Sequence, residues 1–298
     1  MPTRFEVETP FPAGEVPESI TTDHRGNLYI SEGNRILKRS IFGELTVYAT
    51  LPLPIYALGV KVGPEGCIYV ASTSLSEVPG AFVWRSCQPG SIEVYAELDP
   101  SGSPNDLAFD RRGNLFVTDP VLGRVWKLDR RGTPEVFVED PLLRGNPDDP
   151  ALIFRPMGVN GIAIDERERF IYLSNTDAGS ILRVSLDAHH HARLAVVVQD
   201  SLLRGADGVA FDDAGTLFVA VNATDSLVIV DRHREVRLLA TGSPLDSTSS
   251  LAFGETHSDR HVLYVISSAF SRTFGLRAGT PQPALLTTPV AIPGLMLP

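Results

Sequence analysis

Short apolar segments follow one another in pairs along the whole chain. In residues 158–165 Asn160 stands at the entry of the first segment of a pair, and Asp165 follows five residues later, before the second segment. The same arrangement begins five more times, at Glu18, Leu58, Asn105, Asp207 and Ser249. We call these six residues the lead positions.

The second segment of each pair begins with an aliphatic, an aromatic and another aliphatic residue. The six start at Leu28, Ile68, Leu115, Ile171, Leu217 and Leu263. Continuous apolar segments rich in β-branched and aromatic residues predict strands buried on both faces. The turns at residues 23–27, 110–114 and 212–216 start with Asp and have Gly near their ends, as in tight hairpins.

Third and fourth strands are predicted after most pairs, for example at residues 35–40 and 46–50. The residues five after the leads stand at positions 23, 63, 110, 165, 212 and 254, a spacing of about 40 to 55 residues. Four strands in such a repeat predict an all-β protein, a six-bladed β-propeller formed by residues 1–298 as one domain. A two-domain β-sandwich is the alternative. We expect little helix, and we expect residues 4–8 to close the ring against the last blade.

Charge and composition exclude several classes of protein. The net charge of −10 argues against a nucleic-acid partner, which needs a basic surface. No apolar run approaches the roughly 20 residues of a membrane helix, and the first residues do not resemble a secretory signal, so we expect a cytoplasmic protein without membrane contact. Cys67 and Cys87 have no metal-ligand spacing, and we interpret them as reduced structural thiols.

In a propeller the first strand of every blade lines the central channel, so the lead positions form a ring at one end. Glu18, Asn105, Asn160 and Asp207 would then converge as oxygen donors suited to one divalent metal ion, Ca²⁺ above all, with Mg²⁺, Mn²⁺ or Zn²⁺ as further options. The alternative is that each makes only turn hydrogen bonds to the backbone. The second strands end near the same mouth, with residues that would orient the ligands or contact substrate: Glu32, Asp119, Asn175 and Asn222.

These motifs carry a resemblance. Residues 17–19, 104–106, 159–163 and 206–212 resemble the motifs of the SMP-30/gluconolactonase/LRE-like family, along nearly the whole chain. That family comprises six-bladed propellers with one divalent metal in the channel, many of which hydrolyse lactones. The resemblance implies that Glu18, Asn160 and Asp207 bind the metal, that Asn105 binds metal or substrate, and that Asp207 is also the general base.

One position departs from the pattern of this family. Sugar-lactone members have Arg two residues before the Asn that corresponds to Asn105, whereas this chain has Ser103. The loss of that charged donor favours a more apolar lactone or ester, and Tyr56, Phe154 and Met157 are the candidate contacts to it. The long connection at residues 141–157, rich in proline, is either a lid over the mouth or a surface excursion.

We therefore expect a metal-dependent hydrolase of a small-molecule lactone or ester, working as a monomer or weak homo-oligomer. The alternatives are a lyase, isomerase or cyclase on the same propeller, and a non-catalytic binding propeller. We expect His189–His191 to form a solvated hairpin tip. The other histidines considered as catalytic bases, His24, His233, His257 and His261, lie in predicted turns away from the lead positions, so the base is a carboxylate or a metal-bound water.

Overall fold

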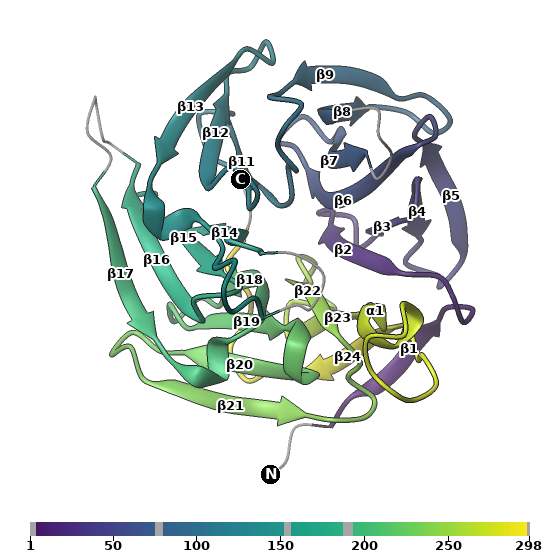
Figure 1. The fold of residues 1–298 in the computed structure, drawn as a ribbon. Coiled ribbons are helices and arrows are strands. Elements are labelled where there is room, and N and C mark those ends of the chain that lie inside the picture. Colours follow the sequence, from purple (N-terminus) through teal and green to yellow (C-terminus); the bar gives the residue numbers. More distant parts are fainter. Residues whose placement is uncertain (1–3, 75–79, 152–155, 187–192, 297–298) are drawn as a thin grey trace.

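The computed structural model describes residues 4–74, 80–151, 156–186 and 193–296. These residues form six four-stranded antiparallel sheets arranged around a central channel, as Figure 1 shows. The prediction of a six-bladed β-propeller is therefore confirmed.

The first three blades follow the chain in order from the innermost strand outward. Blade 1 has β2 (Pro17–Thr22), β3 (Leu28–Glu32), β4 (Arg35–Arg39) and β5 (Leu45–Thr50). Blade 2 has β6 (Ile55–Val62), β7 (Ile68–Ser74), β8 (Ala81–Ser86) and β9 (Glu93–Glu97). Blade 3 has β10 (Leu107–Phe109), β11 (Leu115–Asp119), β12 (Arg124–Leu128) and β13 (Pro134–Glu139).

The last three blades complete the ring. Blade 4 has β14 (Val159–Ile164), β15 (Phe170–Asn175), β16 (Ser180–Ser185) and β17 (Leu194–Gln199). Blade 5 has β18 (Ala206–Phe211), β19 (Leu217–Val221), β20 (Ser226–Val230) and β21 (Val236–Thr241). Blade 6 has β22 (Thr248–Phe253), β23 (Val262–Ser267) and β24 (Ala284–Pro289), with β1 (Glu6–Pro10) as its outer strand.

The amino-terminal strand closes the ring, as predicted. β1 pairs antiparallel with β24, with Glu6 opposite Thr287, so both ends of the chain contribute to one blade. In Figure 1 the purple β1 lies beside the yellow β24. A strand from the start of the chain thus completes the last blade and closes the ring.

Helical segments are short among the described residues. They are η1 (Pro141–Leu143), η2 (Ser201–Leu203), η3 (Asn222–Thr224) and α1 (Phe270–Thr273). None of these helices is long and apolar enough to cross a membrane.

The turn at residues 23–27 has the Asp hydrogen bonds and the glycine conformation of a tight hairpin. The carboxylate of Asp23 accepts the backbone N–H groups of Arg25 and Asn27, at 2.9 and 2.8 Å, and Gly26 takes φ +80°, which glycine adopts without strain. The second strands are the core of the protein, because β3, β11 and β19 are buried at every position. Their side chains pack against those of the neighbouring blades.

The interpretation of the cysteines is wrong. Cys67 and Cys87 form a disulfide, with Cα atoms 4.2 Å apart. Ile68 pairs with Ser86 across β7 and β8, so the residues just beyond this pair lie opposite each other. The 20-residue separation does not reveal that register. Because disulfides persist mainly in oxidising compartments, this bond weighs against the cytoplasmic location, which stays a prediction.

Candidate active site

The lead residues meet at one end of the channel, where the inner strands begin. Glu18 lies in β2, Asn160 in β14 and Asp207 in β18, while Asn105 lies just before β10. Glu18, Asn105 and Asp207 line one small cavity of about 10 Å³, roughly the room of a single water molecule or ion. Residues that are up to 189 positions apart in the sequence are thus brought together by the closure of the ring.

A bulge in the inner strand marks the lead position of most blades. The pairing shifts between Pro17 and Ile20 in β2, and the equivalent shifts occur in β6, β14, β18 and β22. A bulge inserts an extra residue into one strand and re-aims its side chain. The sequence pattern did not indicate this irregularity, and β10 of blade 3 pairs without it.

Two amide oxygens at this end of the channel are buried and have no hydrogen-bond partner among the described residues, although neither residue lines the small cavity. They are Oδ1 of Asn160 and Oδ1 of Asn222. Nδ2 of Asn160 donates to the hydroxyl of Thr176 at 3.0 Å, and Nδ2 of Asn222 faces Oδ2 of Asp207 at 3.4 Å. A buried oxygen without a donor is costly unless something supplies the missing contact. The chemistry of these oxygens therefore fits a cation in the site.

Three carboxylates share this end of the channel. Burial raises the pKa of Glu18 to about 7, with the charge of Asp106 as a second cause. Burial, followed by the charges of Glu18 and Asp106, raises the pKa of Asp207 well above its ordinary value. Like charges that cannot reach water favour neutral carboxyl groups. A bound divalent cation would relieve the repulsion that raises both pKa values.

Asp106 is a residue of the site that sequence reasoning missed. Its Oδ1 accepts the N–H of Leu107 at 2.8 Å, and its Oδ2 accepts the N–H of Ile162 in blade 4 at 3.1 Å. Burial raises its pKa, although the nearby Lys61 acts in the opposite direction. The signal that could have identified it is its position directly after a lead residue and directly before β10, the inner strand of blade 3.

The described acidic side chains alone do not form a metal site here, so amide oxygens would have to complete it. Within the described ranges no group of three or more His, Cys, Asp or Glu side chains is arranged to hold a metal ion. Glu18 and Asp207 supply two carboxylates, and Asn160 supplies an oxygen that lacks a partner. Carboxylate and amide oxygens are the ligands that Ca²⁺ and Mg²⁺ take in proteins. The residues present thus fit a hard divalent cation.

The four residues that end the second strands have different surroundings. Asn222 contacts Asp207, as expected of an orienting residue. Glu32 instead accepts two hydrogen bonds from Arg35, and Asp119 accepts the N–H groups of Ser103 and Leu122. Asn175 donates to the carbonyls of Leu142 and Arg144. The last three residues hold loops around the mouth.

The connection at residues 140–158 is fastened to blade 4 by one buried carboxylate. Asp177, which is 3% exposed, accepts backbone N–H groups of Asn146, Ala151 and Met157 at 2.7–2.9 Å. Arg204 adds hydrogen bonds to the carbonyl and carboxylate of Asp149. The described part of this connection is therefore an ordered rim of the mouth.

The residues predicted to contact substrate differ in how much of their surface is exposed. Ser103 is 1% exposed and Met157 is 5% exposed, so neither offers surface to a ligand in this structure. Tyr56 is 36% exposed and lies near the start of the inner strand β6. Phe154 and His189–His191 lie outside the described residues. Of this set, Tyr56 is the described residue with surface to offer to a substrate.

The remaining lead residue with a polar side chain serves the backbone. The hydroxyl of Ser249 donates to the carbonyl of Glu18 at 2.6 Å, which links blade 6 to blade 1. The histidines considered as bases lie in turns or at a strand edge, and His24 pairs with Glu255 at the opposite end of the hairpin from Glu18. That the base is a carboxylate or a metal-bound water stays a prediction.

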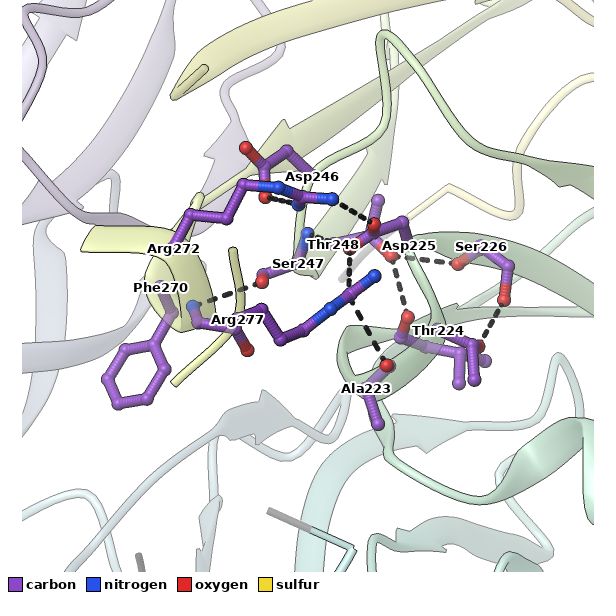
Figure 2. A network of polar contacts seen from close by, with 12 residues as sticks. Ala223, Thr224, Asp225, Ser226, Asp246, Ser247, Thr248, Phe270, Arg272 and Arg277 are labelled. Carbon is purple, nitrogen blue, oxygen red and sulfur yellow. Dashed lines mark hydrogen bonds and ion pairs between the residues drawn. The ribbon is translucent and has the colours of Figure 1, made fainter. Parts of the chain in front are cut away.

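A network of ion pairs forms the rim beside Asn222 (Figure 2). Arg272 extends from α1 and donates to Asp225 at 3.0 Å and also to Asp246. Arg277 donates to Asp225 at 2.8 Å and lies 3.4 Å from the carbonyl of Ala223, next to Asn222. Asp225 has φ +49°, an uncommon conformation for a residue other than glycine. The segment after β23 is thereby fixed to blade 5.

A second cavity lies at the opposite end of the channel. Its walls are mostly apolar and include Val62, Ile162, Phe211 and Phe253, with Leu295 of the carboxyl-terminal segment across it. It contains none of the lead residues. Although this cavity is larger, the group of acidic and amide side chains marks the lead end as the candidate active site.

Comparison with known proteins adds sequence relatives. A model of the SMP-30/Gluconolactonase/LRE-like region matches residues 16–269. A gluconolactonase from Zymomonas mobilis is 29% identical over 212 residues, which are 66% of this chain and 57% of that protein. The chain thus spans less than two thirds of the length of this relative.

Solved structures show the same fold. The calcium-binding protein regucalcin from Agrobacterium tumefaciens has a TM-score of 0.72 at 18% identity, covering 99% of this chain and 95% of that chain. A gluconolactonase from Xanthomonas campestris has a TM-score of 0.68 at 16% identity, covering 98% and 90%. At such identities these likenesses establish the fold alone. The family match over most of the chain establishes more: this protein belongs to the SMP-30/gluconolactonase/LRE-like family.

Proposed function

We propose that this protein is a metal-dependent hydrolase of lactones or related esters. The observation that carries the proposal is the pairing of buried carboxylates with buried amide oxygens that lack a partner, at the mouth of the channel. The relative named gluconolactonase and the calcium-binding neighbour support it.

Glu18, Asn160 and Asp207 would hold the cation, with Asn105 beside them as a further ligand or a contact to substrate. A divalent ion held there would polarise the lactone carbonyl and acidify a water molecule. Asp207 would accept the proton of the attacking water, because its carboxylate lies in the same small cavity as Glu18 and Asn105. Asn222 contacts Asp207 and keeps it in place. The ring C–O bond of the lactone breaks, and the product is a hydroxy acid.

Substrate preference follows from the departure at Ser103. This residue is buried, and its backbone N–H donates to Asp119 at 3.1 Å, so it does not replace an arginine as a donor to sugar hydroxyls. Tyr56 offers a partly exposed aromatic ring near the mouth. We infer that aliphatic or aromatic lactones are hydrolysed faster than gluconolactone.

A pH-indicator assay on a panel of about a dozen lactones tests this proposal. We expect hydrolysis that stops with chelator, returns with Ca²⁺ or Mn²⁺, and is lost in Asp207→Asn, which keeps an oxygen ligand but removes the base. Gluconolactone as the best substrate would overturn the substrate preference. Absence of hydrolysis on every lactone would overturn the reaction class and favour a lyase or isomerase on the same site.

A further inference from the structure

Three buried hydroxyl groups link the lead residues of neighbouring blades. Ser31, Thr118 and Ser174 occupy the same position, the next-to-last residue of the second strand, in blades 1, 3 and 4. Each is 0% exposed. The equivalent residues in the other blades are Ala71, Ala220 and Ile266, so a propeller blade does not need a hydroxyl there.

Each hydroxyl makes the same two contacts. It accepts the N–H of the residue after the lead of its own blade, and it donates to the carbonyl of the lead residue in the next blade. In blade 4 the hydroxyl of Ser174 accepts from Gly161 at 2.7 Å and donates to Asp207 at 2.7 Å. In blade 3 the hydroxyl of Thr118 accepts from Asp106 at 3.0 Å and donates to Asn160 at 2.5 Å.

These two hydroxyls join three of the candidate ligands into one chain of contacts. Asn105 precedes Asp106, which is bound by Thr118, and Thr118 binds Asn160. Asn160 precedes Gly161, which is bound by Ser174, and Ser174 binds Asp207. The relative positions of Asn105, Asn160 and Asp207 are therefore fixed through their backbones.

The backbones of blades 4 and 5 are closely packed where the Ser174 hydroxyl joins them. A Cβ atom at Gly161 would lie 2.3 Å from the carbonyl oxygen of Asp207 and 2.9 Å from the Cα atom of Gly208. Glycine permits blades 4 and 5 to approach here, and the Ser174 hydroxyl joins them at that point. The position of Asp207 thus depends on a tightly packed contact between the two blades.

Blade 1 makes the same contact beside Glu18. Ser31 accepts the N–H of Ser19 at 3.0 Å and donates to the carbonyl of Leu58. Because Ser19 follows Glu18, Ser31 also bears on a candidate ligand and cannot serve as a control.

Ser268 is a buried serine whose described contacts do not include the candidate ligands or their neighbours. It is 1% exposed, accepts the N–H of Phe270 at 3.3 Å and donates to the carbonyl of Ser247 at 2.7 Å. Loss of its hydroxyl also removes two hydrogen bonds to the backbone from the fold.

We propose that Thr118 and Ser174 are positioning residues that set the spacing of Asn105, Asn160 and Asp207 and thereby the affinity of the site for a divalent cation. The proposal rests on the proposed metal site. Groups that orient metal ligands from behind commonly change affinity by about 10- to 100-fold when they are removed. Hydroxyls that served only the fold would affect stability and not cation binding.

Calorimetric titration of Ca²⁺ into chelator-stripped protein tests the proposal, with denaturant unfolding of the same variants measured alongside. We expect Ser174→Ala and Thr118→Val to weaken Ca²⁺ binding by about tenfold or more. Thr118→Ser keeps the hydroxyl and should restore affinity to within about twofold of wild type. The control Ser268→Ala should lose stability, with its affinity unchanged.

Two results would overturn the inference: equal loss of affinity in Ser268→Ala and Ser174→Ala, or unchanged affinity in Ser174→Ala and Thr118→Val. Should Ser174→Ala fail to fold, the pair Thr118→Val and Thr118→Ser decides the question, because Thr118→Val replaces the hydroxyl with a methyl group, whereas Thr118→Ser keeps the hydroxyl and loses only the methyl group. Wild-type protein that binds no divalent cation overturns the proposed metal site, and this inference with it.

Discussion

Removal of Arg272 tests the ion-pair network on the rim. Its side chain is 19% exposed, and it contacts Asp225 and Asp246, which are 7% and 5% exposed. In Arg272→Ala, Asp225 keeps Arg277 and the N–H of Ser247, whereas Asp246 keeps only the N–H of Gln282 among its described contacts. Breaking a buried pair from one side leaves a charge that is neither solvated nor paired, at a cost of about 3–5 kcal/mol.

Arg277→Ala is the matched control. Arg277 is 36% exposed and shares Asp225 with Arg272, so its removal leaves no carboxylate without a guanidinium. Exposed ion pairs contribute about 1 kcal/mol or less. Urea unfolding should therefore show a large drop in midpoint for Arg272→Ala and a small one for Arg277→Ala, with similar slopes. Equal losses in the two variants would refute the reasoning.

The pH dependence of this loss gives a second check. Burial raises the pKa of Asp225, but hydrogen bonds from Ser247, Arg272 and Arg277 outweigh it and hold the pKa below the ordinary 3.8. A lowered folded-state pKa means that the contribution is present above pH 3.8 and is lost as the pH falls through the folded value. The stability difference between wild type and Arg272→Ala should shrink below about pH 4. Replacing Asp246 with Asn in the Arg272→Ala background should recover part of the loss, because the unpaired charge is removed.

Three further predictions concern the site and its surroundings. The pKa of Glu18 is raised from 4.5 to about 7 in the folded protein, so ionisation favours the unfolded chain. Metal-free protein should therefore lose up to about 3 kcal/mol of stability as the pH rises through this window. Melting curves in chelator should show this loss for wild type and a flatter profile for Glu18→Gln. Asp177→Ala should expose residues 140–151 to limited proteolysis, since three backbone N–H groups lose their acceptor. The control Asp148→Ala changes an exposed carboxylate of the same segment and should leave cleavage unchanged. Reduction of the Cys67–Cys87 disulfide should lower stability by about 3 kcal/mol, as expected for a loop of this length, without changing cation affinity, and Cys67→Ser should reproduce the loss.

The repeat in the sequence determined the fold, because burial on both faces forces each second strand to be apolar. It also placed Glu18, Asn105, Asn160 and Asp207 at one end of the channel, since equivalent residues of equivalent strands must meet when the ring closes. The role of these residues as ligands was not decided by that argument and stays a prediction.

Features that depend on contacts between blades could not be predicted. The bulges at the lead positions, the link from Asp106 to Ile162 and the disulfide all arise from register and from the approach of separate strands. Asp119 and Asn175 were expected near the ligands because they end strands at the mouth, yet their side chains bind nearby backbone groups instead. A residue's place on a strand fixes its end of the channel, but not its partner.

The most direct test of the account is an anomalous difference map from crystals of the protein soaked in Mn²⁺. The account predicts one strong peak at the lead end of the channel, within coordination distance of Glu18, Asn160 and Asp207, at about 2.0–2.6 Å as for hard divalent cations bound by oxygen. The peak should disappear in a matched soak of an Asp207→Ala crystal. A map without a peak at that place, or with its strongest peak elsewhere on the protein, would contradict the central claim.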